Sequence, residues 1–171
     1  MPLRLECDHA VTHSDAIDLW PLYDEVFGDS STFDDWLDAV WRKHSTRDGF
    51  RLVRARLDGS LVGFAYGYTG DYGQWWTDRV AQTLAPDVAA DWLGGHFELV
   101  SVGVLPAARR MGIGRELLRQ VTAGLPHDRL LLMTSADPED PAGRLYAAEG
   151  WAVIGPGLRD ETVIMGRRAQ H

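Results

Sequence analysis

The feature that most constrains the fold is a strand that runs through a glycine-containing loop into a helix. It spans residues 102–115 and reads Val-Gly-Val-Leu-Pro-Ala-Ala-Arg-Arg-Met-Gly-Ile-Gly-Arg. Glycines let the backbone approach a ligand closely. A helix N-terminus presents unpaired N–H groups and a positive dipole end, both of which favour an anion. Because Arg109, Arg110 and Arg115 add positive charge, the segment predicts a phosphate or pyrophosphate site.

Two common phosphate-binding motifs do not describe this loop. It lacks the lysine and the Ser/Thr of a Walker A motif. It also lacks G-x-G-x-x-G spacing and lies late in the chain, which argues against a Rossmann dinucleotide site. What remains is R-x-x-G-x-G at Arg109, Gly112 and Gly114. Its structural alternative is a tight β–α turn with solvated arginines.

Hydrophobic periodicity predicts an α/β fold with a mixed central sheet. Residues 50–57 alternate and precede Asp58-Gly59, a strong hairpin signal, so residues 61–68 form the return strand. Leu130–Met133 is a continuous apolar run, consistent with a strand buried on both faces. Other strands are expected at Leu3–Glu6, Phe97–Val104, Trp151–Ile154 and Thr162–Met165, which makes about six to seven strands in all.

Capping residues predict the helices that flank this sheet. Residues 70–96 are interpreted as a helical insertion before the fourth strand, since Trp75 and Pro86 each begin an apolar helical pattern. A further helix is expected over Gly112–Gly124. The predicted N-caps elsewhere are Ser14, Thr32 and Asp140 (with Pro141 at N1), and the predicted ends are Gly28 and Gly150.

Composition limits the classes of function. The 171 residues suffice for one domain, expected over residues 1–171. The formal net charge of −8 argues against non-specific binding to nucleic acid or an anionic membrane, and is compatible with a cationic substrate. The chain has no long apolar run and no secretory signal pattern, and its single cysteine, Cys7, rules out an internal disulfide; together these features predict a cytoplasmic location. Cys7 itself is expected in the core.

Two segments together resemble the GNAT acetyltransferases. That family's signature is Q/R-x-x-G-x-G/A after a strand ending in V-x-P. Val104, Pro106, Arg109, Gly112 and Gly114 occupy those positions. Residues 142–151, Ala-Gly-Arg-Leu-Tyr-Ala-Ala-Glu-Gly-Trp, fit the family's A-x-x-L-Y-x-x-x-G-F/W helix and following strand. The resemblance covers residues 97–154 and implies the GNAT fold.

The resemblance implies acetyl-CoA as cosubstrate. The backbone of Val102, Gly103 and Val104 would pair with the pantetheine arm like an added strand, and the loop would bind the pyrophosphate. The implied loop residues are Arg109, Arg110, Met111, Gly112, Ile113, Gly114 and Arg115. One position departs from the family: the asparagine that many members place seven residues before the tyrosine is Glu139 here, which cannot donate a hydrogen bond as an amide does.

Tyr146 occupies the position of the family's usual general acid. A phenol of pKa about 10 can protonate a thiolate whose basicity is near 8.5. The structural alternative is a tyrosine that packs on a helix face beside Leu145.

Glu98 is the leading candidate for the general base. Alternation places Glu98 on the strand face of Val100, Val102 and Val104. Its position resembles that of the catalytic glutamate in histone-acetylating members. Because the reference pKa of glutamate is about 4.3, action through water or with a raised pKa is expected. Two alternatives replace Glu98 as the base: His96, which lies on the same strand face, or a water chain. In a third, Glu98 is an ion-paired edge residue without a catalytic role.

The other histidines show no metal-ligand spacing, so no metal is expected. Trp36, Trp41, Trp75, Trp76 and Trp92 either line a substrate cleft, where aromatic faces bind cations, or pack the core and the insertion.

The predicted function is N-acetyl transfer from acetyl-CoA to a primary amine by direct attack in a ternary complex. A second hypothesis is a non-catalytic acyl-CoA-binding regulatory module on the same fold, and a third is a nucleotide-phosphate binder. The family resemblance also makes a homodimer plausible. The acceptor amine and the preferred acyl length stay open at this point.

Overall fold

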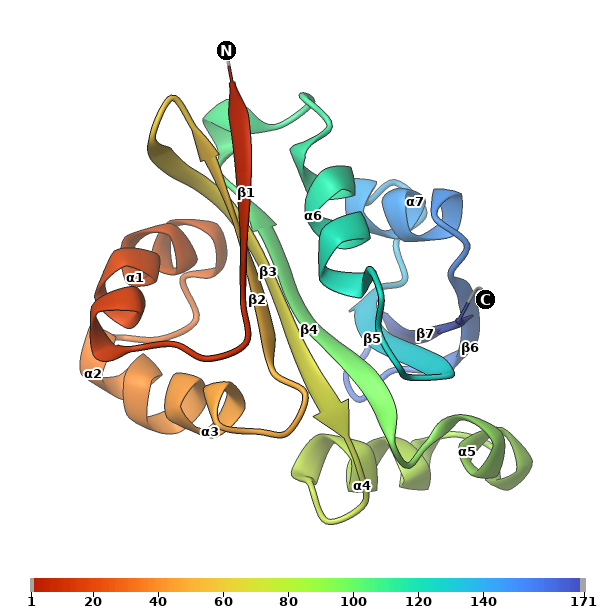
Figure 1. Cartoon of the computed structure of the whole chain (residues 1–171). Helices are drawn as coiled ribbons and strands as arrows, with labels where there is room; N and C mark the ends of the chain where they lie inside the picture. The colour runs from red at the N-terminus through yellow and green to blue at the C-terminus, as the bar shows by residue number, and fades with distance from the viewer. Residues whose placement is uncertain (1, 170–171) are drawn as a thin grey trace. The chain divides into compact units, whose positions relative to one another are not determined.

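A tight turn at Asp58 and Gly59, with φ of +50° and +82°, joins the two strands of a hairpin within a seven-stranded sheet (Figure 1). The computed structural model describes residues 2–169. The strand order is β1-β2-β3-β4-β5-β7-β6. The strands are β1 (Leu3–Asp8), β2 (Arg51–Leu57), β3 (Ser60–Gly70), β4 (His96–Val104), β5 (Arg129–Ser135), β6 (Ala152–Pro156) and β7 (Thr162–Arg168).

The strands and helices follow one another in the order that the periodicity predicts, with no helix between β2 and β3 or between β6 and β7. The sheet is mixed, because β4 and β5 are parallel while β1–β2, β2–β3, β5–β7 and β6–β7 are antiparallel. The α-helices are α1 (His13–Phe27), α2 (Phe33–Trp36), α3 (Arg42–Ser45), α4 (Trp75–Thr83), α5 (Pro86–Trp92), α6 (Ile113–Thr122) and α7 (Pro141–Ala148). The predicted insertion before the fourth strand is confirmed as α4 and α5.

The chain divides into two compact units. The first comprises residues 2–68 and 100–124, and the second residues 69–99 and 125–169, within the described chain.

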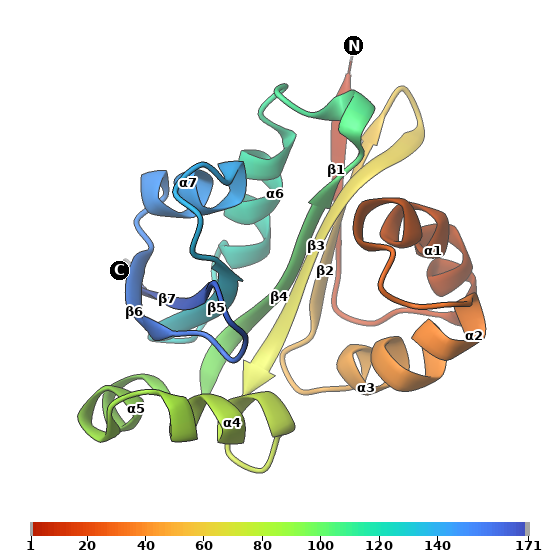
Figure 2. The same ribbon diagram turned by 180° about the vertical axis from the view of Figure 1, so that it is seen from behind.

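In the first unit, side-chain alternation along β3 separates two packing faces. Phe64, Tyr66 and Tyr68 lie in a buried cluster with residues of α1 and α2. Gly63 faces the other way, since a Cβ there would lie 3.0 Å from Leu117 of α6. The helices α1 to α3 and the helix α6 therefore cover opposite faces of these strands (Figures 1 and 2).

In the second unit, α4 and α5 pack on one face of β5 and β7, where Leu131 and Ile164 lie in a cluster with Val80, Leu84 and Leu93. The neighbouring β7 residues, Val163 and Met165, point to the opposite face and meet α7. The apolar run Leu130–Leu132 is buried, as expected of a central strand.

The start of α1 differs from the prediction. Thr12, not Ser14, is the N-cap: its hydroxyl accepts from the Asp15 amide at 3.2 Å, and the Asp15 carboxylate accepts from the Thr12 amide at 2.7 Å. This capping box requires an acceptor side chain three residues after the cap. Asp15 supplies it for Thr12, whereas Ile17 cannot supply it for Ser14.

Two further features differ from expectation. Residues Leu37–Trp41 form a π-helical segment (η1), in which the Arg42 amide bonds to the Leu37 carbonyl and the rings of Trp36 and Trp41 stack 5.2 Å apart. The prediction that Cys7 is a core residue is wrong, because Cys7 is exposed on β1, which lies at an edge of the sheet.

Candidate functional site

The loop between β4 and α6 has a backbone suited to an anion. Arg110 has a φ of +65° and Gly112 a φ of +79°, so two left-handed residues bracket Met111. Left-handed residues within a turn direct successive N–H groups to one side and form anion-binding concavities. Arg110 is one of three non-glycine residues with positive φ in the described chain, and the sequence carried no signal of its conformation.

The N-terminus of α6 has no side-chain cap. Gly112 is the N-cap and, having no side chain, makes no capping hydrogen bond. The amides of Ile113, Gly114 and Arg115 begin the helix, and their partial positive charge favours an anionic guest.

The loop is also cationic and accessible. Arg109, Arg110, Met111 and Arg115 are exposed. The Arg109 Nε donates to the Val104 carbonyl at 3.1 Å, so this side chain spans the loop.

Gly103 has a packing role that the sequence did not indicate. A Cβ there would lie 3.0 Å from the Phe64 ring, 3.1 Å from Val26 and 3.2 Å from Phe27. Its small size therefore lets α1 and β3 pack against the strand. Val102 and Val104, on either side of it, are half-buried.

Glu98 lies on β4 in the second unit and is 5% exposed. It stands opposite Leu131 in the parallel register of β4 with β5. Burying a carboxylate among apolar strand residues is costly unless it has polar contacts.

His96, two residues earlier, is enclosed by the second unit. It is 0% exposed, and its Nδ1 accepts from the Gly94 amide at 3.1 Å, which assigns the ring proton of the neutral form to Nε2. Burial, with a smaller contribution from Arg129, lowers the pKa of His96 to about 4. This geometry favours a packing role over that of a base.

Tyr146 lies on α7, which Asp140 caps by accepting from the Ala142 amide at 2.9 Å, as predicted. The side chain is 8% exposed, and its ring lies 6.1 Å from that of Trp151. Burial, followed by the charge of Asp140, raises the pKa of Tyr146 to about 12, so the phenol carries its proton at neutral pH.

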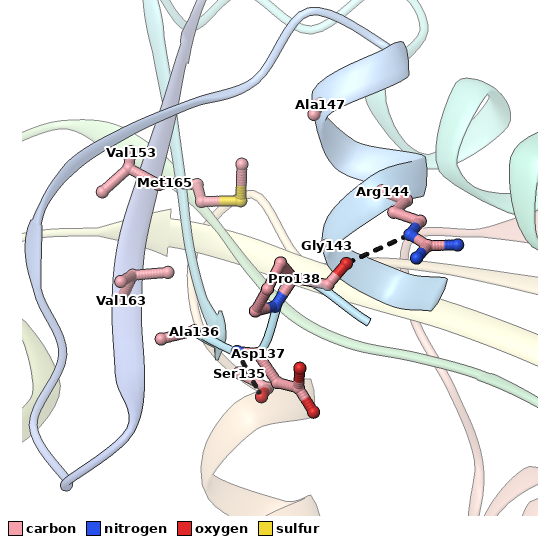
Figure 3. A pocket seen from close by; sticks show the side chains of 10 residues that line it. All are labelled: Ser135, Ala136, Asp137, Pro138, Gly143, Arg144, Ala147, Val153, Val163 and Met165. Carbon is pink, nitrogen blue, oxygen red and sulfur yellow. Dashed lines mark hydrogen bonds between the residues drawn. The ribbon is translucent and has the colours of Figure 1, made fainter. Parts of the chain in front are cut away.

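A pocket of about 260 Å³ opens beside α7 in the second unit (Figure 3). Val153, Val163 and Met165 face it from β6 and β7, while Gly143 and Ala147 leave room on the helix. Neither Glu98 nor Tyr146 lines it. The pocket is therefore separate from the two predicted catalytic side chains.

A polar cluster at the end of β3 in the first unit was missed by the sequence analysis. His44 Nδ1 lies 2.8 Å from the Tyr66 hydroxyl, and Arg47 donates to the Tyr68 hydroxyl at 2.6 Å. Burial, followed by the charges of Arg47 and Lys43, lowers the pKa of His44 to about 4. These pairings join β3 to His44 of α3 and to Arg47, which follows α3.

The structure thus brings the predicted cofactor-binding residues 102–104 and 109–115 together in the first unit. Glu98, His96 and Tyr146 lie in the second. Within residues 2–169 no group of three or more His, Cys, Asp or Glu side chains is arranged to hold a metal ion. The same described residues contain no helix that is long and apolar enough to span a membrane.

Comparison with protein families gives a match between residues 15–151 and the model of the Acetyltransferase (GNAT) family. A "GCN5-like protein acetyltransferase" of Mycobacterium tuberculosis is 37% identical over 101 residues, which cover 55% of this chain and 49% of that protein. The chain thus spans about half the length of this curated relative.

Solved structures show the same fold. The ribosomal-protein-S18-alanine N-acetyltransferase of Escherichia coli superposes with a TM-score of 0.66 at 15% identity, over 98% of this chain and 96% of that one. The PaiA N-acetyltransferase of Thermoplasma acidophilum, solved with coenzyme A, gives a TM-score of 0.60 at 16% identity, over 99% and 100% of the two chains.

Proposed function

Since the chain belongs to the acetyltransferase (GNAT) family, we propose that it transfers the acetyl group of acetyl-CoA to a primary amine by direct attack in a ternary complex. The observation that carries the proposal is the loop at Arg109–Arg115, whose left-handed residues lead into an uncapped helix N-terminus. A pyrophosphate is the group that such a loop would bind.

The proposed donor site consists of this loop and the preceding strand. The amides of residues 110–115 would bind the pyrophosphate, with Arg109 beside them. The backbone of Val102, Gly103 and Val104 would pair with the pantetheine arm by strand addition. The register of β4 with β5 covers Phe97 and Glu98, and Val102–Val104 lie farther along the strand.

The proposed reaction begins with a neutral amine. Its lone pair attacks the thioester carbonyl carbon, and the tetrahedral intermediate collapses as the C–S bond breaks. The new amide nitrogen loses one proton and the departing thiolate gains one. Glu98, directly or through water, would accept the first proton, and Tyr146 would supply the second. Held together, the two reactants avoid much of the entropic cost of meeting.

The raised pKa of Tyr146 affects the second proton transfer. In water a phenol of pKa about 12 is a weak donor to a thiolate whose conjugate acid has a pKa near 8.5. Burial raises the pKa of a thiol as well. The gap between the pKa of the Tyr146 phenol and the pKa of the CoA thiol therefore narrows when the thiolate forms beside the phenol. The hydroxyl is protonated throughout the physiological range and is available to donate a hydrogen bond to sulfur.

A polypeptide amine is the proposed acceptor. The curated relative bears the name of a protein acetyltransferase, and one structural neighbour acetylates an alanine of a ribosomal protein by its name. The net charge of −8 complements a basic polypeptide.

The test is release of free thiol from acetyl-CoA with a panel of amines and lysine peptides, with products identified by mass spectrometry. Turnover should require an amine and fall at least 100-fold in Tyr146→Phe, and Glu98→Gln should change the pH–rate profile. Tight binding of acetyl-CoA without turnover on any amine would favour the binding module. Stabilisation by ATP or NAD but not by CoA would favour a nucleotide-phosphate binder.

Unchanged turnover of Tyr146→Phe across pH would remove the acid role. An unchanged pH–rate profile of Glu98→Gln would remove the base role. The single domain over residues 1–171, the cytoplasmic location and the homodimer expected from the sequence stay predictions.

A further inference from the structure

Met111 carries an exposed thioether in the first unit, where it is 52% exposed. The other methionines of residues 2–169 are better shielded. Met165 is 4% exposed, and the Met133 sulfur accepts from the Leu158 amide at 3.4 Å. Exposing a large apolar side chain costs hydrophobic free energy. Met111 is therefore the methionine of the described chain that is most open to a small oxidant in solution.

The loop that carries Met111 is the proposed pyrophosphate loop. Arg110 and Gly112, on either side of it, have φ of +65° and +79°. Gly112 is the N-cap of α6 and has no side chain that could accept from the first amides of the helix. The Met111 sulfur is joined to this backbone by a short, unbranched and flexible chain. A strong acceptor at the end of that chain would compete with an anion for the same amides.

Oxidation turns the thioether into such an acceptor. When hydrogen peroxide reacts, a sulfur lone pair attacks one peroxide oxygen, the O–O bond breaks, an S–O bond forms and water leaves. Sulfur is oxidised and the peroxide is reduced. A thioether sulfur accepts hydrogen bonds weakly, whereas the sulfoxide is polar and its oxygen carries a partial negative charge.

We propose that Met111 is an oxidation site that regulates donor binding. Conversion of its side chain to the sulfoxide weakens the affinity of the loop for the pyrophosphate of acetyl-CoA, and reduction restores it. The inference rests on the proposed function for the identity of this ligand. The sulfoxide oxygen takes an amide donor from the pyrophosphate and repels its charge, and the loss of one hydrogen bond lowers affinity about fivefold.

The first experiment identifies the residue that is oxidised. The whole protein is treated with hydrogen peroxide, and peptide mass spectrometry follows the gain of oxygen at Met111, Met133 and Met165. Met111 should be oxidised first, because access to the sulfur limits the reaction. Oxidation of Met133 or Met165 before Met111 would overturn the proposal.

The second experiment measures binding before and after oxidation. Acetyl-CoA is titrated by calorimetry, and inorganic pyrophosphate by phosphorus NMR. Both dissociation constants should rise about fivefold in the oxidised protein. An equal change for inorganic pyrophosphate places the effect in the loop, because this probe lacks the pantetheine arm. Unchanged affinities at full oxidation of Met111 would overturn the proposal, as would no binding of either probe to the untreated protein.

Reversal distinguishes the methionine from the exposed thiol of Cys7, which peroxide also oxidises. Methionine sulfoxide reductases A and B, supplied with dithiothreitol, should restore the affinity. Dithiothreitol alone reduces disulfides and sulfenic acids and should not restore it. Full recovery with dithiothreitol alone would overturn the proposal.

Three variants assign the effect to one sulfur atom. Met111→Leu keeps a similar volume without sulfur, so its affinity for acetyl-CoA should be the same before and after peroxide. Met165→Leu and Cys7→Ser, the matched controls, should still lose about fivefold in affinity on treatment, as the wild type does. A peroxide-dependent loss of affinity in Met111→Leu would overturn the proposal.

Failure of this proposal is distinguishable from failure of the proposed function. Acetylation of an amine, with an affinity for acetyl-CoA that oxidation of Met111 leaves unchanged, would retain the acetyltransferase and overturn the oxidation site. Binding of inorganic pyrophosphate that peroxide weakens in wild type but not in Met111→Leu, with no turnover on any amine, would retain the oxidation site and overturn the function.

Discussion

The ring of His96 fills the space that a side chain at Gly70 would need: a Cβ on Gly70 would lie 2.2 Å from Nε2 of His96 and 2.7 Å from its Cε1. The histidine is fully buried, so its ring has little room to withdraw. The absence of a side chain at residue 70 is therefore what allows a histidine to begin β4.

Gly70→Ala should destabilise the protein by about 1–3 kcal/mol, because the added methyl overpacks a buried site. Urea denaturation followed by circular dichroism measures the change. Gly143→Ala is the matched control, because its Cβ would come no closer than 3.9 Å to the Ser135 carbonyl oxygen. In the helix α7 that substitution should be neutral or stabilise by up to about 1 kcal/mol. Equal stability of Gly70→Ala and wild type would refute the packing argument.

His96 should make the free energy of unfolding depend on pH. Its folded-state pKa is about 4 and its unfolded value about 6.5, so between these values the unfolded chain binds a proton that the folded chain does not. The stability is then fully present above pH 6.5 and is lost as the pH falls toward 4. From pH 7 to pH 5 the loss is about 2 kcal/mol.

The check is urea denaturation of wild type and His96→Asn at pH 7 and pH 5. Wild type should lose more stability than the variant over this interval. The pKa of His44 is also lowered to about 4, so the free energy of unfolding should still decrease with falling pH in both proteins. An identical pH dependence in the two proteins would show that His96 is not the group responsible.

Alanine variants of two glycines at opposite ends of α6 should distinguish the effect of backbone strain on stability from the effect of the loop on anion binding. Gly112 and Gly124 have φ of +79° and +66°, and a Cβ on either would meet nothing within 4 Å. Alanine at each position should cost about 1 kcal/mol of stability, because left-handed backbone disfavours a Cβ. Only Gly112→Ala should also weaken acetyl-CoA binding, by about five- to tenfold in calorimetry, because only Gly112 lies in the proposed pyrophosphate loop. Equal weakening by both variants would contradict that site.

Arg54 should contribute more to stability than an exposed arginine. It is 7% exposed, and it donates to Asp8 at 2.6 Å and to Asp15 at 3.1 Å. Arg54→Met should cost about 1–3 kcal/mol, since it removes the cation that the two carboxylates share while they keep part of their hydration. Arg42→Met, which breaks an exposed pair with Asp38, should cost less than about 0.5 kcal/mol. Similar losses in thermal denaturation would argue against a special role for Arg54.

Much of the fold was predictable because its signals are local. Asp58-Gly59 adopts the positive φ values that a tight hairpin needs, and Asp140 accepts from the Ala142 amide two residues away. The error at Ser14 was also local: the capping box beginning at Thr12 was overlooked. The π-helical turn at Leu37–Trp41 left no comparable signal, because it depends on how Trp36 and Trp41 stack in the core.

The candidate site also combines features with a local sequence signal and features that depend on contacts between distant segments. The loop at Arg109–Arg115 could be identified from glycine spacing, since backbone freedom belongs to each residue. The left-handed conformation of Arg110 could not, because arginine has no preference for it. The full burial of His96 is a property of its neighbours, above all of Gly70, which is 26 positions away in the chain.

The sequence by itself determined the order of strands and helices, the glycine-containing loop proposed to bind an anion, and the family resemblance. Each depends on residues within a few positions of one another, where turn chemistry, capping and periodicity act. Only the tertiary structure decided which of the tryptophans are buried and which, like Trp75, face solvent, and that Cys7 lies outside the core. It also decided that His96 packs as a neutral ring and that Tyr146 keeps its proton. Burial and pKa are set by contacts between segments far apart in the chain, and no local pattern records them.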